Sequence, residues 1–237
     1  MGRNTFFQFK QFRIEQDKCA MKVTTEGCLF GASIQLDGTE ARILDIGTGT
    51  GLLSLMLAQR AKGQVLAVEL DTDAAKQAED NFNNSPWSER LEVANMAIQE
   101  YAGATDETYD LVVCNPPFFS NHFKSGKAKD RAIHNDSMGQ QDLLESVLRL
   151  LSDNGTFWVI YPKKEYREFE QLAIQNGLYH FKRISVRNTP DSGDFRVIGA
   201  FHKLEVIEES ANSVVTIRGN DGEYSAELTA LLEDYYL

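Results

Sequence analysis

The sequence contains no apolar stretch that approaches the roughly 20 residues of a membrane-spanning helix. Its first ten residues have neither a continuous apolar core nor a small-residue cleavage site, so we expect no signal peptide. Cysteines are also few: Cys19, Cys28 and Cys114 lie far apart, and none belongs to a Cys-x-x-Cys pair. This spacing indicates neither a disulfide framework nor a zinc site, and it favours a reducing, cytoplasmic location.

Basic side chains are scarce as well, since 24 Lys and Arg face 35 Asp and Glu and give a net charge of −11. A protein that coats nucleic acid non-specifically needs the opposite balance. A local basic surface can still hold one structured RNA, because the field near a patch matters more than the total. The histidines are scattered and predict no metal site.

The clearest motif follows the short apolar run 43–46 and consists of Gly47, Gly49 and Gly51 at alternate positions. Glycines after a buried strand permit positive φ in the turn and let a ligand approach the backbone. A helix is expected at 51–61, and its first N–H groups would face that ligand. NAD-binding dehydrogenases instead use Gly-x-Gly-x-x-Gly, so a dinucleotide loop is the weaker alternative.

Strands and helices alternate from residue 42 onward. Expected strands are 42–46, 64–69, 90–94, 109–114, 155–161, 180–187 and 195–202, and expected helices are 51–61, 72–84, 138–151 and 163–175. This order predicts an α/β fold, a doubly wound, mostly parallel sheet of seven strands. The last two strands are joined too closely for a crossover, so they form an antiparallel hairpin at one edge.

We expect one main domain, 36–204, with short extensions at both ends. The N-terminal extension, 1–35, is rich in phenylalanine and is interpreted as a packed lid, with stacking on bases as the alternative. The C-terminal extension, 205–237, contains a β-rich piece at 213–218, a turn at 220–222 and a final helix, and it would pack on the same domain.

The second decisive motif, Asn115-Pro116-Pro117-Phe118, directly follows the strand expected at 109–114. An exocyclic amine is a poor nucleophile, and a site that methylates it needs hydrogen-bond acceptors rather than a strong base. The Asn115 side-chain oxygen and the Pro116 carbonyl can accept its two N–H bonds and so orient the lone pair. Pro116 and Pro117 fix φ and remove donors, and Phe118 would stack on the planar base.

Together these two motifs, with Asp45 before the glycines, resemble S-adenosylmethionine-dependent methyltransferases that act on planar nitrogen. Three further segments, 9–12, 19–32 and 235–237, are similar to the family that methylates N6 of adenine-37 in the anticodon loop of valine tRNA. The resemblance covers nearly the whole chain. It implies S-adenosylmethionine as cofactor, a valine tRNA as partner and 115–118 as the catalytic motif.

The resemblance also implies where the cofactor binds. Besides Asp45 and the three glycines, Glu69 at the end of the second strand would accept both ribose hydroxyls. Asp71 is the alternative acceptor, or else it caps the helix that follows. The third strand lacks a carboxylate at its end, so a backbone group or Asn95 would meet the cofactor adenine. The N-terminal extension would cover the cofactor, with contacts from Lys22, Thr25 and Gly31.

The segment after the catalytic motif is locally basic within an acidic protein. Its side chains are interpreted as contacts to RNA phosphates, with a solvated loop as the alternative; they are Lys124, Lys127, Lys129, Arg131 and His134. Other functions stay open on the sequence alone: guanine-N2 methylation of ribosomal RNA, glutamine methylation of release factors, or a non-catalytic cofactor-binding subunit. We expect a monomer or a weak dimer.

Overall fold

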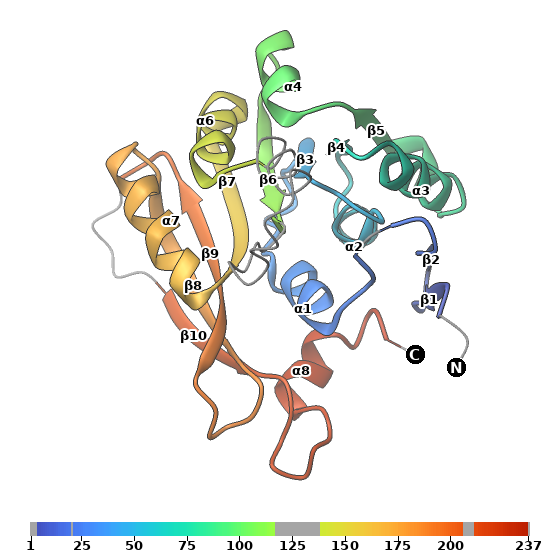
Figure 1. Ribbon diagram of the computed structural model, residues 1–237, viewed down its shortest axis with the longest axis vertical. Coiled ribbons are helices and arrows are strands. Elements are labelled where there is room, and N and C mark those ends of the chain that lie inside the picture. Colours follow the sequence, from blue (N-terminus) through green and yellow to red (C-terminus); the bar gives the residue numbers. More distant parts are fainter. Residues whose placement is uncertain (1–3, 20, 117–137, 206–210, 237) are drawn as a thin grey trace, which may run out of the picture.

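The computed structural model describes residues 4–19, 21–116, 138–205 and 211–236. The strands are β1 (Phe6–Gln8), β2 (Arg13–Glu15), β3 (Arg42–Ile46), β4 (Gln64–Glu69), β5 (Leu91–Asn95), β6 (Tyr109–Cys114), β7 (Leu151–Pro162), β8 (Tyr179–Arg187), β9 (Asp194–His202) and β10 (Ala211–Thr216). The helices are α1 (Thr25–Ser33), α2 (Leu52–Arg60), α3 (Thr72–Asn83), α4 (Ile98–Ala104), α6 (Gln140–Leu150), α7 (Lys163–Gln175) and α8 (Ala226–Leu231). Figure 1 shows their arrangement.

One large sheet organises the molecule, with the strand order β10-β8-β9-β7-β6-β3-β4-β5. Strands β3 to β7 pair in parallel, while β9 runs antiparallel to both β7 and β8. The predicted mostly parallel sheet with an antiparallel hairpin is therefore confirmed. The predicted count of seven strands is corrected to eight, because β10 pairs in parallel with β8 and covers the outer side of the hairpin.

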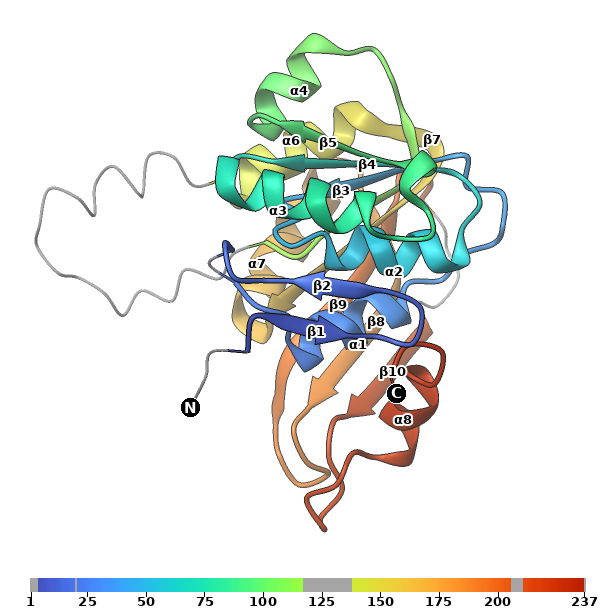
Figure 2. The ribbon, with the colours of Figure 1, turned by 90° about the vertical axis from the view of Figure 1, so that its right-hand side faces the viewer.

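The sheet separates two hydrophobic cores, and alternation along its strands supplies both. Ile43 faces the core built with α1, α2, α3 and α8, whereas its neighbour Leu44 faces the core built with α4, α6 and α7. In β6, Val113 likewise faces the first core and Val112 faces the second. Figure 2 shows α4 and α6 on one side of β3–β5 and α2 on the other. Helices on both faces are what a parallel sheet requires, because its strands are buried on both sides.

The register of the sheet brings the ends of five parallel strands to one edge. Ile46 pairs with Val68 and with Cys114, and Glu69 pairs with Asn95. The residues that directly follow β3, β4, β5, β6 and β7 therefore lie along this edge, which we call the carboxyl edge. In open α/β sheets ligands bind at this edge, so the fold places the two sequence motifs side by side.

Both extensions pack on the main domain. Helix α1 lies against α2, where a Cβ at Gly31 would come within 2.6 Å of the Met56 sulfur. The tail joins the same core through Tyr235, whose hydroxyl donates to the Met56 carbonyl at 3.1 Å. Phe9 and Phe12 are buried and stacked, with their ring centroids 4.4 Å apart, which is the expected packing role. The division at residues 35 and 205 stays a prediction.

Within the described ranges, no helix combines the length and apolar character needed to cross a membrane.

Candidate cofactor and amine site

The glycine loop has the positive φ angles that its sequence predicts. Gly47, Gly49 and Gly51 all have positive φ, at 71°, 57° and 84°. The Gly47 amide donates to the Val68 carbonyl at 2.8 Å, which closes the turn against β4. A Cβ added at Gly47 or Gly49 would meet no atom within 4 Å. The backbone therefore borders open space, as a loop that a ligand approaches closely should.

Asp45 stabilises the conformation of this loop. Its side chain is fully buried, and one carboxylate oxygen accepts from the hydroxyls of Thr48 at 2.6 Å and Ser54 at 2.8 Å. Burial raises the pKa of Asp45 to about 6, although the two hydroxyl donors oppose the rise. These two bonds hold the loop in shape, while the other carboxylate oxygen has no hydrogen-bond partner among the described residues; a contact of Asp45 with the cofactor stays a prediction.

Asp45 makes the stability of the cofactor-free protein depend on pH. Its folded pKa of about 6 lies above the ordinary 3.8, so the folded state binds more protons and stability falls as pH rises between these values. The difference between the two pKa values corresponds to a loss of about 3 kcal/mol in the free energy of unfolding, and this loss is complete near pH 7. We expect Asp45→Asn, which cannot ionise, to remove this slope. Urea unfolding of both proteins from pH 4 to 8 measures it, and parallel curves would contradict the prediction.

Gly51 precedes α2 and has no room for a side chain. A Cβ there would come within 2.5 Å of the Phe82 ring, in addition to the strain of positive φ. We expect Gly51→Ala to lower the free energy of unfolding by about 2–4 kcal/mol. Gly38→Ala is the matched control, because Gly38 also has positive φ but no neighbour within 4 Å. It should lose about 1–2 kcal/mol, the cost of positive φ alone. Equal losses in urea melts would contradict the role of Phe82.

Glu69 lies beside the glycine loop, as predicted. Its two carboxylate oxygens accept from the backbone amides of Gly49 and Asp71, each at 2.9 Å. Each oxygen keeps a second lone pair, so the carboxylate can still accept two ribose hydroxyls. Asp71 caps α3 through its acceptance from the Ala74 amide at 2.8 Å, which is the alternative role considered for it. The Asn95 amide nitrogen donates to the Glu69 carbonyl at 2.9 Å and so joins β5 to this corner.

Two apolar side chains in this corner were missed by the sequence analysis. Leu70 and Met96 directly follow β4 and β5, and they are 55% and 36% exposed. Large apolar side chains that stay exposed beside polar acceptors are typical of a ligand site. The sequence does contain a signal for them: an apolar residue directly follows the polar residue that ends each strand, Glu69 or Asn95.

Asn115 follows β6 at the same edge and carries an unpaired acceptor. Its side-chain oxygen is buried and has no hydrogen-bond partner among the described residues. A buried polar atom without a partner is costly, so such an atom indicates a ligand. A Cβ at Gly27 would lie 4.0 Å from the Asn115 amide nitrogen, so the first turn of α1 borders this site. Pro116 is buried beside it, while Pro117 and Phe118 lie outside the described residues.

The three residues of the N-terminal extension that were expected to contact the cofactor differ from one another in their surroundings. The Lys22 amine donates to the Asn4 carbonyl at 2.7 Å, and the Thr25 hydroxyl lies 3.4 Å from that of Tyr224. Gly31 is buried against α2, where its carbonyl accepts from Arg60 at 2.7 Å, so we correct its expected role from cofactor contact to helix packing. The sequence analysis missed that 25–33 forms a helix, capped by the side chain of Thr24.

The predicted RNA contacts Lys124, Lys127, Lys129, Arg131 and His134 lie outside the described residues. In the part of the chain that is described, no group of three or more His, Cys, Asp or Glu side chains is placed to hold a metal ion. Cys114 is fully buried in the core at the end of β6, and burial holds its pKa well above the usual value.

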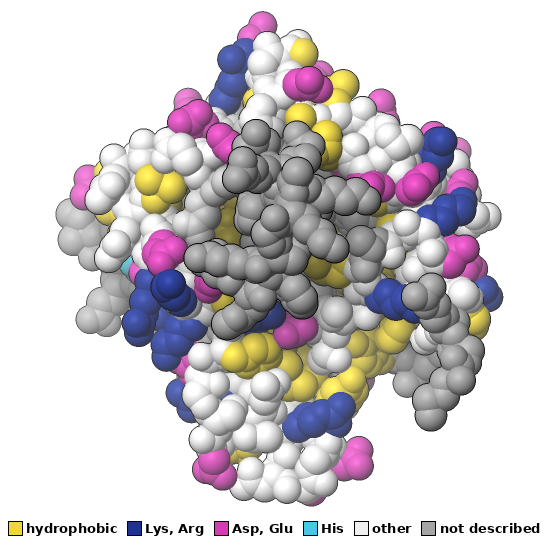
Figure 3. All heavy atoms as spheres, viewed as in Figure 1, with side chains coloured by type: hydrophobic (Ala, Val, Ile, Leu, Met, Phe, Trp, Pro, Cys, Tyr) yellow, Lys and Arg dark blue, Asp and Glu magenta, His cyan; other side chains and the backbone are white. Residues whose placement is uncertain are grey.

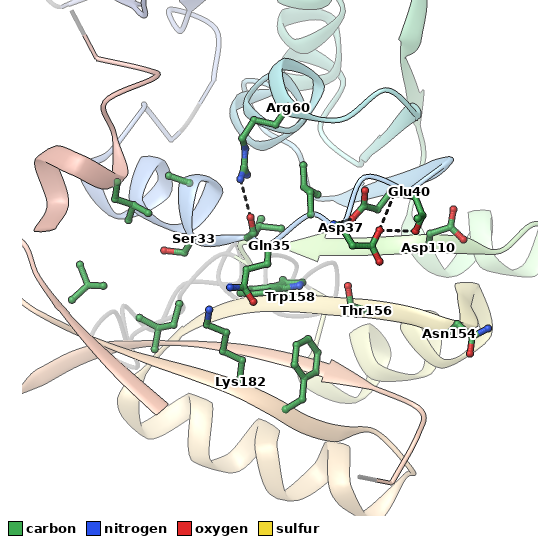
Figure 4. A pocket seen from close by; sticks show the side chains of 18 of the residues that line it. Ser33, Gln35, Asp37, Glu40, Arg60, Asp110, Asn154, Thr156, Trp158 and Lys182 are labelled. Carbon is green, nitrogen blue, oxygen red and sulfur yellow. Dashed lines mark hydrogen bonds between the residues drawn. The ribbon is translucent and has the colours of Figure 1, made fainter. Parts of the chain in front are cut away.

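A cavity of about 980 Å³ lies at the opposite edge of the sheet (Figure 4). Its lining includes Gln35 before β3, Asp110 and Lys182 in the first halves of β6 and β8, and Trp158 in the second half of β7. The Asp110 carboxylate there accepts from the backbone amides of Ala41 and Arg42, where β3 begins. This cavity contains neither the glycine loop nor Asn115, so the carboxyl edge is the better candidate for the chemistry.

Comparisons with known proteins agree with this geometry. The family model described as "Methyltransferase small domain" matches residues 29–184. Curated proteins named tRNA1(Val) (adenine(37)-N6)-methyltransferase are similar over almost their full length. The one from Cytophaga hutchinsonii is 42% identical over 99% of this chain and 98% of its own. The one from Photorhabdus laumondii is 39% identical over 99% and 96%.

Solved structures share the fold at low identity. A structure titled as a predicted O-methyltransferase from Agrobacterium tumefaciens has a TM-score of 0.66 at 17% identity, covering 87% of this chain and 95% of its own. Pyrococcus horikoshii TYW2, solved in complex with MeSAdo, has a TM-score of 0.56 at 15% identity, covering 86% and 74%.

Proposed function

The chain belongs to the family of tRNA1(Val) (adenine(37)-N6)-methyltransferases, and on this premise we propose that it methylates N6 of adenine-37 in a valine tRNA with S-adenosylmethionine as donor. The observation that carries the proposal is the buried, unpaired oxygen of Asn115 beside the open glycine loop. An amine nucleophile needs such an acceptor, and full-length similarity to the named relatives selects adenine as its source.

The residues at the carboxyl edge fit S-adenosylmethionine. The open space over Gly47 and Gly49 admits a ligand against the backbone, and Glu69 offers two acceptors to a ribose. Leu70 and Met96 would flank the flat adenine ring of the cofactor, with the oxygen of Asn95 beside it. When bound, the cofactor supplies a sulfonium methyl group, an electrophile that needs no metal for its transfer.

The chain's own residues would prepare the amine. The target adenine leaves its stack, which is the usual way that enzymes reach a base. Asn115 and the Pro116 carbonyl accept its two N–H bonds, so the nitrogen lone pair points toward the methyl group. Phe118 stacks on the ring and fixes its plane. Acceptors without a strong base suffice here, and the released proton passes to water.

We place the reaction in the cytoplasm, where this substrate is found. Three free thiols support that placement, since Cys19, Cys28 and Cys114 form no disulfide.

The function is tested by incubating the protein with labelled S-adenosylmethionine and total tRNA that lacks this modification. Digestion to nucleosides then identifies the product. Label in N6-methyladenosine, confined to valine tRNA, is the expected result. Ribosomal RNA and release factor are incubated in parallel. Label in N2-methylguanosine of the ribosomal RNA or in glutamine of the release factor, with none in tRNA, would overturn the substrate assignment and keep the chemistry.

A further inference from the structure

The protein is acidic, yet several cations gather near the carboxyl edge. Lys163 begins α7 directly after β7, the neighbour of the strand that leads to Asn115. Lys164 and Arg167 are exposed on the first turns of the same helix, and Arg187 ends β8 at this edge. We call Lys163, Lys164, Arg167 and Arg187 the α7 cluster. Figure 3 shows dark-blue side chains gathered over the lower end of α7 and the neighbouring hairpin.

One partly exposed acid organises this cluster. Asp194 accepts from Arg187 at 2.7 Å and from Lys163 at 3.2 Å, and these hydrogen bonds hold its pKa below the usual range. It shares one negative charge between two cations. Lys164 is 81% exposed and only loosely paired, with Glu168 at 3.9 Å, and Arg167 has no ion pair in the described part of the chain. Cations remain available to phosphates.

A second element near the site belongs to the C-terminal tail. Arg218 and Tyr224 form a bridge across the turn at 219–223, and the Arg218 guanidinium lies 4.9 Å from the centre of the Tyr224 ring. Arg218 also donates to the Gly222 carbonyl at 2.6 Å, which holds the turn in place. Tyr224 is 39% exposed. We call Arg218 and Tyr224 the tail bracket.

Contacts connect the tail to α1, which borders Asn115, and to the end of β8. The Tyr224 hydroxyl lies 3.4 Å from that of Thr25 in the first turn of α1, the turn that borders Asn115 through Gly27. The tail also joins the end of β8, because the Ile217 amide donates to the Arg187 carbonyl at 2.8 Å. The α7 cluster and the tail bracket therefore lie on connected elements around the carboxyl edge, and together they form the surface considered below.

We propose that this surface docks the RNA substrate: the α7 cluster binds backbone phosphates, and a nucleotide next to the target stacks on Tyr224 beside Arg218. The proposal rests on the proposed function. Cations next to exposed aromatic rings are the combination that unpaired nucleotides require, since phosphates need charge and bases need a flat partner. A localised surface of this kind also reconciles RNA binding with a net charge of −11.

The phosphate contacts are tested through the salt dependence of binding. We expect Lys164→Gln with Arg167→Gln to weaken binding of an unmodified valine tRNA transcript roughly 10-fold at 0.1 M salt and to reduce the slope of log K against log salt by about 1.4. The matched control is Lys62→Gln with Arg149→Gln, two exposed cations at the opposite edge, which should bind like the wild type. Equal slopes in all three proteins would overturn the phosphate role.

The stacking contact is tested with two substitutions of one side chain. Tyr224→Ala should raise KM for the tRNA roughly 10-fold with kcat unchanged, whereas Tyr224→Phe, which keeps the ring, should behave like the wild type. If the alanine variant retains the wild-type KM, the stacking role is wrong. If both variants lose activity equally, the hydroxyl contact to Thr25 is what matters, and stacking is again wrong. A wild type that fails to methylate tRNA would instead refute the proposed function.

Discussion

Replacing Asn115 by alanine is expected to lower kcat for methyl transfer by about 10²- to 10³-fold, while the Kd for S-adenosylmethionine stays within about two-fold. The substitution removes the buried oxygen that has no partner in the described structure, and with it the acceptor that orients the amine. The hydrogen bonds of Glu69 and of the glycine loop do not involve this side chain, so the cofactor should still bind. Single-turnover kinetics with tRNA and calorimetry with the cofactor measure the two quantities.

The matched control is Asn154→Ala, an exposed asparagine in the first half of β7 at the opposite edge. It should leave kcat and cofactor affinity unchanged. Loss of folding or of cofactor binding in the Asn115 variant would contradict the assigned role, because the side chain would then be a structural support of the site.

Glu69→Ala is expected to weaken S-adenosylmethionine binding by about 100-fold. Hydrogen bonds to a charged group contribute about 1.5–3 kcal/mol each, and the alanine loses two acceptors for the ribose. It also releases the amides of Gly49 and Asp71, so the glycine loop loses part of its support. Calorimetric titration of the cofactor measures the change, and a shift of less than five-fold would contradict ribose binding by Glu69.

Asp71→Ala separates the two acids that the sequence analysis proposed for the ribose. Asp71 caps α3 by accepting from the Ala74 amide, so its removal should cost about 1 kcal/mol of folding stability and change cofactor affinity little. The reverse result, with affinity lost and stability kept, would assign the ribose to Asp71.

The sequence could predict the sheet and the position of its two motifs because these depend on local patterns. The apolar run 43–46, followed by glycines at alternate positions, has few other structural solutions, and the structure gives all three glycines positive φ. The placement of Asn115 beside the glycine loop required only the rule that parallel strands end at a common edge. The turn at 220–222 was likewise predictable from Asn-Asp-Gly, and Gly222 has a φ of 84°.

Helix α1 could not be predicted in the same way. Its two glycines, Gly27 and Gly31, lower helix propensity, and most of its residues are buried, so it has no clear polar face. The helix forms because α2 packs closely against it: a Cβ at Gly31 would lie 2.6 Å from the Met56 sulfur, and one at Gly27 would lie 3.0 Å from Leu52. Tertiary contact overrode local preference here.

The pairing of strands that lie far apart in the chain could not be predicted from the sequence either. The β-rich piece in the tail was expected, yet nothing local indicated that β10 would join β8 as an eighth strand. The same pairing brings Arg218 next to the end of β8. The surface formed by the α7 cluster and the tail bracket is therefore visible only in three dimensions.

The central claim concerns one nucleotide, and a pair of valine tRNA transcripts tests it most directly. The two differ only at position 37, with adenine in one and guanine in the other, and each is incubated with the protein and labelled S-adenosylmethionine. We predict N6-methyladenosine in the first and no label in the second. Equal labelling of both transcripts would contradict the claim, because the target would then lie elsewhere in the RNA.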